Sequence, residues 1–484
     1  MKKTVASLLL ITILTMAFSC AEQVEPVVVE TTSAEEETTA ESSVPAADFG
    51  GETITILAMN NSSTNFPYLE ILAESENGET INDAVYKRNI YLEDKFKIEI
   101  EAMQIKPAGN YGFEVLQKDT ISGDNTFDIG LVASLHAFRA MLNGYLTQMD
   151  NLPYVDKNSI GWCSYFNDVT SIEGHNYFLA GDMNIGLFAG SGMLYFNKTV
   201  AEQYKLENMY ELVEEGKFTI DKFAELCKQV TTDIDGDSEY GDNDRVGYRG
   251  NAYAFQMFLG GFKETLVKKD ENDIPCLNIS EGIIDRIVKS IDNLNYKPYI
   301  FQANLEKVSI PDFKADLSLF LTNPAYSLSM LRDMESDFGL LPMPKYDEQQ
   351  DSYYSQIHTS WSSATVIPIT LPEEEHEKIG MILQEMAYIS NKYIRPAFYE
   401  TMLLGKLTRD NESEKMLDYI FGNIVVDITY LLTDYEGFDF DGMTRSMATT
   451  GDNNAASFIA SNRERYESVV NSIPKAVREA YKNN

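Results

Sequence analysis

Apolar residues recur along the first part of the chain in short blocks that alternate with segments of helical spacing. Residues 53–59 (TITILAM) form a β-branched, apolar run after two glycines, which predicts a buried strand. Residues 97–101 alternate like a second strand, and 127–132 predict a third, followed by a helix over 135–142. Between the first two strands, helical spacing behind a Thr80 cap connects Ile81, Val85, Leu92 and Phe96. This order predicts βαβ units and a mostly parallel sheet.

Polar residues follow two of these strands directly. Asn60 comes after the first strand and Ser134 after the third. Ligands of open α/β sheets bind outside the carboxyl ends of the strands. Asn60 and Ser134 are therefore candidate ligand-binding residues.

A second series of strands follows in the middle of the chain. Residues 192–196 (GMLYF), 317–322 and 365–369 (TVIPI) read as strands, and a long helical region is expected from 198 to 228. Pro372 and three following glutamates predict the acidic start of a helix, and helical periodicity dominates from there to Tyr481. The pattern as a whole predicts an α/β fold.

The N-terminus has the features of an export signal. Lys2 and Lys3 precede an apolar run too short to span a bilayer, and small Ser19 stands before Cys20. The segment Ala17-Phe18-Ser19-Cys20 resembles the lipobox of bacterial lipoproteins, which implies a signal peptide over 1–19 and lipidation of Cys20. Residues 20–49 lack basic side chains and are rich in Thr, Ser, Ala and Glu, which predicts a disordered tether. The alternative is a secreted protein cleaved nearby, with Cys20 incidental.

Composition limits the partners of the folded part. The formal net charge is −36, which disfavours nucleic acid and anionic lipid and indicates a neutral or cationic partner. More than 400 residues are enough for two or three domain-sized cores. After the signal, the cysteines are Cys163, Cys227 and Cys276, which allow one disulfide but no disulfide framework.

Several short motifs occur in a consistent order after residue 50. They are 127–130 (FDIG), 144–150 (GYLTQMD), 172–182 (IEGHNYFLAGD), 194–198 (LYFNK), 214–219 (EEGKFT) and 338–344 (FGLLPMP). Together they resemble the extracellular solute-binding proteins of bacterial ABC importers, in particular sugar-binding lipoproteins of the clostridial type.

The resemblance implies a two-lobed, periplasmic-binding-protein-like (type II) fold with a hinge that encloses the ligand. Lobe 1 would comprise 50–190 plus 360–405, and lobe 2 would comprise 191–358 plus 406–484. It also implies a monomer, anchored at the extracellular face of the cytoplasmic membrane, with a membrane permease as partner.

Both tryptophans are candidates for stacking on a sugar. Trp361 lies among hydroxyl residues, including Ser362, and Trp162 has polar neighbours in sequence. Aromatic rings stack on the C–H faces of sugars, but they equally fill gaps in a core. Flanking Ser and Thr favour the binding role for Trp361, whereas the two roles stay open for Trp162. Asp182 could accept sugar hydroxyls or cap the next segment.

An acidic loop in the middle of the chain has the spacing of a calcium site. Asp233, Asp235, Asp237 and Asp244 occupy positions 1, 3, 5 and 12 of a twelve-residue loop, and Glu239 at position 7 would contribute its carbonyl. Ser238 replaces the usual Gly, and Asp244 is shorter than the usual Glu. We expect a structural Ca²⁺ site, and the alternative is a solvated acidic loop.

The sequence gives little support to catalysis. It lacks the common hydrolase, zinc-protease and nucleotide-binding motifs, and we expect each of its four histidines, His358 included, to be a surface or hydrogen-bonded residue. We therefore expect a membrane-anchored protein that captures an oligosaccharide for ABC-type import. The alternatives are a cell-surface glycosidase or lyase, and a ligand sensor or peptide-binding protein of the same fold.

Overall fold

The compact body of the chain begins at Val44. The computed structural model describes residues 42–59, 70–71, 73–105, 111–238, 240, 243–251, 254–294, 300–303, 306–403 and 411–482. Val44 is buried, and the ring of Phe49 stacks on Phe96 with centroids 6.0 Å apart. Residues 44–49, predicted as the end of the tether, therefore pack on the body. Cys20 and the signal segment lie outside the described residues.

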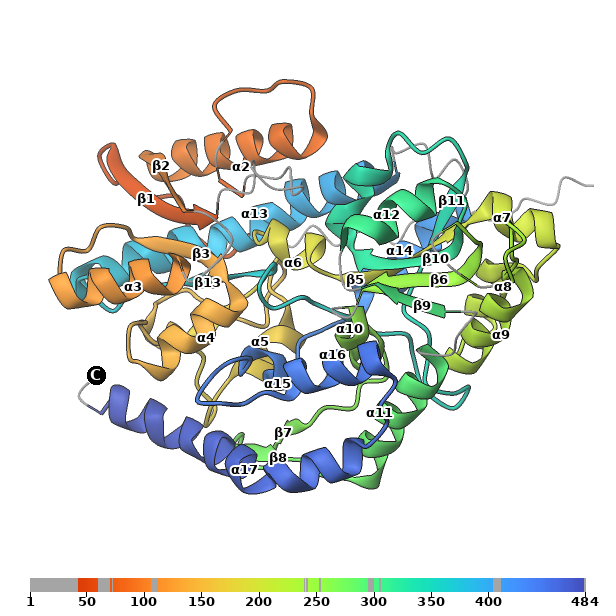
Figure 1. Cartoon of the computed structure of the whole chain (residues 1–484). Coiled ribbons are helices and arrows are strands. Elements are labelled where there is room, and N and C mark those ends of the chain that lie inside the picture. Colours follow the sequence, from red (N-terminus) through yellow and green to blue (C-terminus); the bar gives the residue numbers. More distant parts are fainter. Residues whose placement is uncertain are drawn as a thin grey trace, which may run out of the picture. The chain divides into compact units, whose positions relative to one another are not determined.

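The first sheet has five strands in the order β2-β1-β3-β13-β4 (Figure 1). β1 pairs in parallel with β2 and β3, as the βαβ pattern predicts, but β13 enters antiparallel between β3 and β4. The sheet is therefore mixed, because its fourth strand comes from a distant part of the chain. Its elements are β1 Glu52–Met59, α2 Thr80–Phe96, β2 Ile98–Ile105, α3 Tyr111–Ser122, β3 Ile129–Ala133, β4 Phe178–Leu179 and β13 Ser363–Val366.

α2 shows how the apolar pattern is used. Its predicted apolar stripe is buried, and the long helix α13 (His376–Leu403) lies alongside it (Figure 1). Thr80 is the first helical residue and not the cap, because Glu79 occupies the N-cap position without a side-chain cap bond. Lys97 ends the helix in the left-handed conformation, with φ of 50°. Burial of the apolar stripe therefore stabilises α2 without a side-chain N-cap.

The second sheet has the order β11-β5-β10-β6-β9. β5 runs antiparallel to β10 and β11, whereas β6 is parallel to β10 and β9. The strands predicted at 192–196 and 317–322 are confirmed. The strands are β5 Gly192–Asn197, β6 Val246–Asn251, β9 Ile300–Ala303, β10 Ser318–Pro324 and β11 Phe338–Leu341.

The helical region predicted from 198 to 228 is three helices, α7 Lys198–Tyr204, α8 Met209–Glu214 and α9 Ile220–Val230. Each begins at a polar N-cap, and these caps are Asn197, Asn208 and Thr219. Each cap side chain accepts a backbone N–H of the first turn, which favours a new helix start over continuation.

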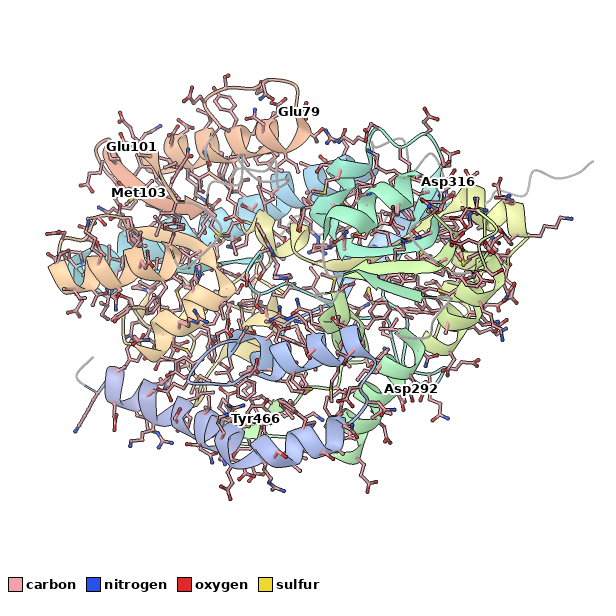
Figure 2. All side chains as sticks on the ribbon, in the orientation of Figure 1. Glu79, Glu101, Met103, Asp292, Asp316 and Tyr466 are labelled. Carbon is pink, nitrogen blue, oxygen red and sulfur yellow. The ribbon has the colours of Figure 1, made fainter. Side chains whose placement is uncertain are left out.

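The remaining elements connect and cover the two sheets. α17 packs on β8 and also contacts α4, and Tyr466 of α17, labelled in Figure 2, stacks on Phe438 with centroids 4.6 Å apart. These elements are α4 Ser134–Leu142, η1 Met149–Asn151, α5 Ser164–Thr170, α6 Ile185–Ala189, α10 Phe255–Gly261, β7 Val267–Lys269, β8 Pro275–Leu277, α11 Glu281–Leu294, α12 Glu306–Lys314, η3 Ala325–Leu331, β12 Ser355–Gln356, η4 Glu373–Glu375, α14 Asn411–Gly422, β14 Ile424–Val425, α15 Ile428–Leu431, α16 Phe440–Thr450 and α17 Ala455–Ala480.

The chain passes between the sheets along two neighbouring segments. One leads from α6 into β5, and the other leads from β12 into β13. They pair through a bridge between Ser191 and Ile357, and the backbone N–H of His358 donates to the carbonyl of Gly190 at 2.9 Å. Residues in and next to these two segments therefore lie at the junction between the first and the second sheet.

Two further properties bear on the sequence expectations. Cys163, Cys227 and Cys276 are free thiols, so the possible disulfide is not formed. In the described part of the chain, no helix combines the length and apolarity needed to cross a membrane.

Candidate functional site

Ser134 and Ser362, both predicted ligand-binding residues, meet where β3 ends and β13 begins. The Ser134 N–H donates to the Ser362 carbonyl at 2.9 Å, and the two hydroxyl oxygens are 2.8 Å apart. Both side chains are fully buried. The pair therefore ties α4 to the second crossing segment and positions the residues around it.

Trp361, next to Ser362, is half-buried at this junction. Its ring centroid lies 5.9 Å from that of Tyr326 in η3 and 6.4 Å from that of His358. Its backbone N–H donates to the His358 carbonyl at 2.9 Å, which fixes the turn that presents the indole. Trp361 and Tyr326 thus place an aromatic pair at the junction of the two sheets, with part of the indole accessible.

Polar groups without partners belong to the Trp361 turn and to the segments connected with it. Within the described residues, no hydrogen-bond partner exists for three buried atoms, Nδ1 of His358, the hydroxyl of Tyr430 and Oδ1 of Asp441. Asp441 pairs with Arg445 across one turn of α16 at 3.1 Å, and the charge of Arg445 acts on His358. Thr359 donates its hydroxyl to the Tyr430 carbonyl at 3.3 Å. These contacts place α15 and α16 beside the Trp361 turn.

The electrostatics of this cluster favour an uncharged His358 and raise the pKa values of its carboxyl groups. Burial lowers the pKa of His358 to about 4, and the Arg445 cation adds to the shift. Burial raises the pKa of Asp427 to about 7 and that of Asp441 above its usual range, against the opposing effect of Arg445. Near neutral pH the imidazole is neutral, and it can donate or accept a hydrogen bond.

We name Trp361, Tyr326, His358, Tyr430 and Asp441 the junction site. It offers an aromatic face together with donors and acceptors whose hydrogen-bonding capacity is unused. A buried polar group without a partner is costly, so a ligand hydroxyl that bonds to it relieves this penalty. The arrangement suits a ligand with apolar C–H faces and several hydroxyl groups.

Trp162 and Asp182 lie against α13. The Trp162 ring is buried in a core cluster, and its Nε1 donates to Oε1 of Gln384 at 3.0 Å. Asp182 accepts from Nδ2 of Asn391 at 2.6 Å and pairs with Arg395 at 3.4 Å. Burial raises the pKa of Asp182 even though Arg395 favours the carboxylate. Both side chains hold α13 in place, and their contact with ligand stays a prediction. Asn60 lies outside the described residues.

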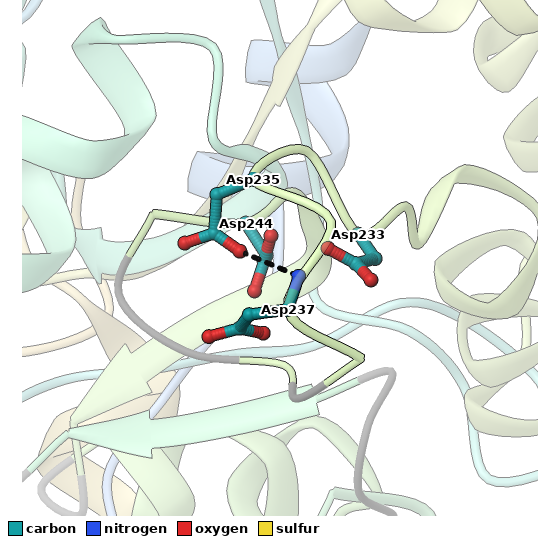
Figure 3. A group of neighbouring side chains, drawn as sticks. All are labelled: Asp233, Asp235, Asp237 and Asp244. Carbon is teal, nitrogen blue, oxygen red and sulfur yellow. Dashed lines mark hydrogen bonds between the residues drawn. The ribbon is translucent and has the colours of Figure 1, made fainter.

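The acidic loop brings four carboxylates together, as its spacing predicts (Figure 3). Oxygen atoms of Asp233, Asp235, Asp237 and Asp244 all lie within 4.8 Å of one another. Ser238 has φ of 67°, so this serine adopts the left-handed conformation usually given to glycine at this position. Glu239 lies outside the described residues.

The separation of these oxygens fits a calcium ion. Ca²⁺ binds oxygen at about 2.3–2.6 Å, so ligands on opposite sides of one ion are about 5 Å apart. Asp244 is buried, and its Oδ1 accepts the N–H of Ile234 at 2.7 Å, so the last ligand of the loop is fixed by the fold. The donor set is all oxygen, which hard cations prefer.

Sequence reasoning missed most of the junction site. Tyr326, Tyr430 and Asp441 come from separate segments without a recognisable motif, and their grouping depends on tertiary structure. His358 was expected to be a surface or hydrogen-bonded residue, whereas its Nδ1 is buried without a partner among the described residues. The only local signal was its position two residues before the Ser-Trp-Ser segment.

Comparison with known proteins identifies the fold of this chain. No protein-family model matches the sequence, and no relative is found among curated proteins. Solved structures that resemble it include the ABC substrate-binding protein Lmo0181 from Listeria monocytogenes, in complex with cycloalternan, at 9% identity and a TM-score of 0.53 over 90% of this chain and 100% of the other.

Two further solved structures resemble this chain with comparable TM-scores and coverage. UgpB from Mycobacterium tuberculosis, in complex with glycerophosphocholine, shares 16% identity with a TM-score of 0.56 over 87% of this chain and 98% of the other. The sugar-binding protein MalE from Xanthomonas citri shares 11% identity with a TM-score of 0.54 over 89% and 100%. The chain therefore has the α/β, two-lobed periplasmic-binding-protein-like fold of ABC substrate-binding proteins, as its motifs predict.

Proposed function

We propose that this chain is an extracellular solute-binding protein that captures a carbohydrate, such as an oligosaccharide, for ABC-type import. The junction site carries the proposal, because it combines the half-buried Trp361, paired with the buried Tyr326, with three buried polar atoms that have no partners among the described residues. Sugars supply hydroxyl groups for such atoms and C–H faces for the rings. The similarity to Lmo0181 in complex with cycloalternan and to the sugar-binding protein MalE supports this ligand class.

A thermal-shift screen with raffinose, maltotriose, amino acids and short peptides tests the ligand class. A ligand at a hundred times its Kd stabilises the folded state by about 2.7 kcal/mol, so a true ligand raises the melting temperature measurably. We expect a shift with an oligosaccharide. A shift with amino acids or peptides alone would contradict the carbohydrate proposal and favour a peptide binder or sensor.

Tyr430→Phe tests whether the junction site is where the ligand binds. The change removes one hydroxyl whose partner would be the ligand, and we expect about tenfold weaker binding by calorimetry. Tyr466→Phe is the matched control, because this tyrosine of α17 is also fully buried but packs on Phe438 and does not belong to the junction site. Equal affinities of the two variants would place the ligand elsewhere.

The glycosidase alternative rests on two carboxyl groups with raised pKa values, Asp427 and Asp441, both of which act on Tyr430. Paired carboxyl groups of unequal acidity are what glycoside hydrolysis requires. We propose that the chain is not an enzyme and expect no new reducing ends when it is incubated with raffinose and maltotriose. Release of product that Asp441→Asn abolishes would establish the enzyme.

We further propose that the acidic loop binds a structural Ca²⁺ ion. The four convergent carboxylates support this, since their mutual repulsion is costly without a cation. Chelation should lower the melting temperature of the wild type and leave Asp235→Asn unaffected. Asp452→Asn, which changes an exposed aspartate outside the cluster, is the control and should respond like the wild type. Absence of Ca²⁺ binding at millimolar concentration would reduce the loop to a charged turn.

We also propose that Cys20 is lipidated and anchors the protein at the extracellular face of the membrane, where a monomer would meet its permease. The signal, lipobox and tether pattern supports this. Cys20→Ala should move the protein from the detergent phase to the aqueous phase or leave it unprocessed. Unchanged partitioning would refute the anchor.

A further inference from the structure

A hairpin outside the junction site is fastened to the first part of the chain by one lysine. The strands β7 and β8 form the hairpin, and Lys269 at the end of β7 reaches the segment that follows α5. Its Nζ donates to the hydroxyl of Ser171 at 2.8 Å and to the Ser171 carbonyl at 3.2 Å, and it also contacts the Asp168 carbonyl. The side chain is only 16% exposed, so its charge is held within these partners.

The tip of the hairpin completes the fastening. Asp273 pairs with Lys269, accepts the N–H of Gly174 at 2.8 Å and offers its carbonyl to the N–H of Glu173 at 3.1 Å. Glu173 in turn binds Arg478 of α17, with Nε 2.9 and 3.0 Å from its two carboxylate oxygens. We call Lys269, Ser171, Asp273, Glu173 and Arg478 the clasp.

The clasp is connected to the junction site through β7. At the start of this strand, the N–H of Val267 donates to the hydroxyl of Thr429 at 3.1 Å. Thr429 is the second residue of α15, and its N–H donates to Oδ1 of Asp427 at 2.8 Å. The next residue is Tyr430, whose hydroxyl belongs to the junction site. A direct hydrogen bond therefore connects β7 to α15, so the position of β7 affects the position of α15.

We propose that Lys269 is a positioning residue for the junction site: it holds β7 on the Ser171 segment and so keeps α15 and Tyr430 in the binding arrangement. Lys269 has no contact with the ligand in this account. The proposal rests on the carbohydrate function only in its binding readout. Its structural readout, the order of α15, does not require a ligand.

The adjacent lysine provides a matched control. Lys268 is 46% exposed and pairs with Glu264, which precedes β7, so Lys268→Met removes the same charge from the same strand without touching the clasp. Lys269→Met removes the contacts to Ser171, Asp168 and Asp273, while Lys269→Arg keeps the charge and the donors.

Hydrogen exchange of the full chain is the first measurement. In Lys269→Met we expect the amides of Thr429 and Tyr430 to exchange about fivefold faster than in Lys268→Met. The reason is that loss of the Lys269 contacts makes local opening of α15 easier without unfolding the whole protein. Lys269→Arg should restore most of the protection. Arg478→Gln, which changes only an exposed arm of the clasp, should shift exchange in the same direction by a smaller factor.

Raffinose titration is the second measurement. Lys269→Met should bind raffinose about three- to tenfold more weakly than Lys268→Met at an unchanged stoichiometry. If the wild type binds no raffinose, the titration tests only the proposed function. The hydrogen-exchange measurement then still decides the role of Lys269. Equal exchange of α15 in Lys268→Met and Lys269→Met overturns the proposal. If Lys269→Met does not fold, unchanged α15 exchange in Arg478→Gln overturns it.

Discussion

The two tryptophans should respond in opposite ways to removal of the ring. Trp361→Ala removes a half-buried indole at the junction site, and Trp162→Ala removes a buried one whose Nε1 is bonded to Gln384. If the first ring serves the ligand and the second serves the core, binding and stability should separate between the variants. The pair therefore tests the assignment of the site within one protein.

The loss of affinity in Trp361→Ala can be worked from the accessible part of the ring. A ligand that covers about 60 Å² of apolar surface gains about 1.5 kcal/mol at 25 cal/mol per Å². Stacking on the ring adds about 0.5–1.5 kcal/mol. The sum of about 2–3 kcal/mol corresponds to binding weaker by about thirty- to a hundredfold.

The stability of the ligand-free variants should show the reverse order. Trp361 is half-buried and packs on Tyr326 and His358, so its truncation should cost about 1–2 kcal/mol. Trp162→Ala leaves a cavity and removes one of the two donors to Oε1 of Gln384, and it should cost about 3–5 kcal/mol. Affinity is measured by calorimetry with the best oligosaccharide from the screen, and stability by urea denaturation. Loss of stability without loss of affinity in Trp361→Ala would refute the assignment.

Three further predictions follow from buried groups. Burial raises the pKa of Glu70 from 4.5 to about 7, so the folded state binds the proton more tightly than the unfolded state. The contribution of this group to the free energy of unfolding is therefore largest below pH 4.5 and falls by about 3 kcal/mol toward pH 7. Urea denaturation of Glu70→Gln at several pH values should lack this fall. The same fall in Glu70→Gln as in the wild type would contradict the pKa shift. Gly161 has φ of 95°, and an added Cβ would lie 2.1 Å from the Ala387 carbonyl, so Gly161→Ala should lose about 3 kcal/mol or more while Gly422→Ala, with open space, should be nearly neutral. A chain that starts at Val44 should melt like one that keeps the full tether, and a chain that starts at Gly51 should melt lower because Val44 and Phe49 are lost from the core; equal melting of both would place the fold boundary at Gly51.

Local patterns located most of the strands because these strands are buried and apolar. The block at 53–59 and the alternation at 97–101 became β1 and β2, and Ser134 follows β3 as predicted. The acidic loop could also be found, since the ligands of such a loop lie within twelve consecutive residues. In each case the information is contained in one short segment.

The junction site could not be found in this way. Tyr326 follows β10, His358 precedes β13, and Tyr430 and Asp441 belong to α15 and α16, so only the tertiary fold brings these separate segments together. Trp162 was equally ambiguous, because polar neighbours in sequence do not show that Gln384, more than 200 residues away, satisfies the indole. Tertiary contacts decide which of two chemically plausible residues is buried.

The strand order of the first sheet has a consequence for how this protein is made. β13, which begins at Ser363, is inserted between β3 and β4, whose residues all precede 180. The first sheet therefore cannot close until three quarters of the chain has been synthesised. Pairings between such distant segments form slowly, because a long loop must be ordered first. A polypeptide with this topology therefore leaves β4 without its partner strand until β13 has emerged from the ribosome.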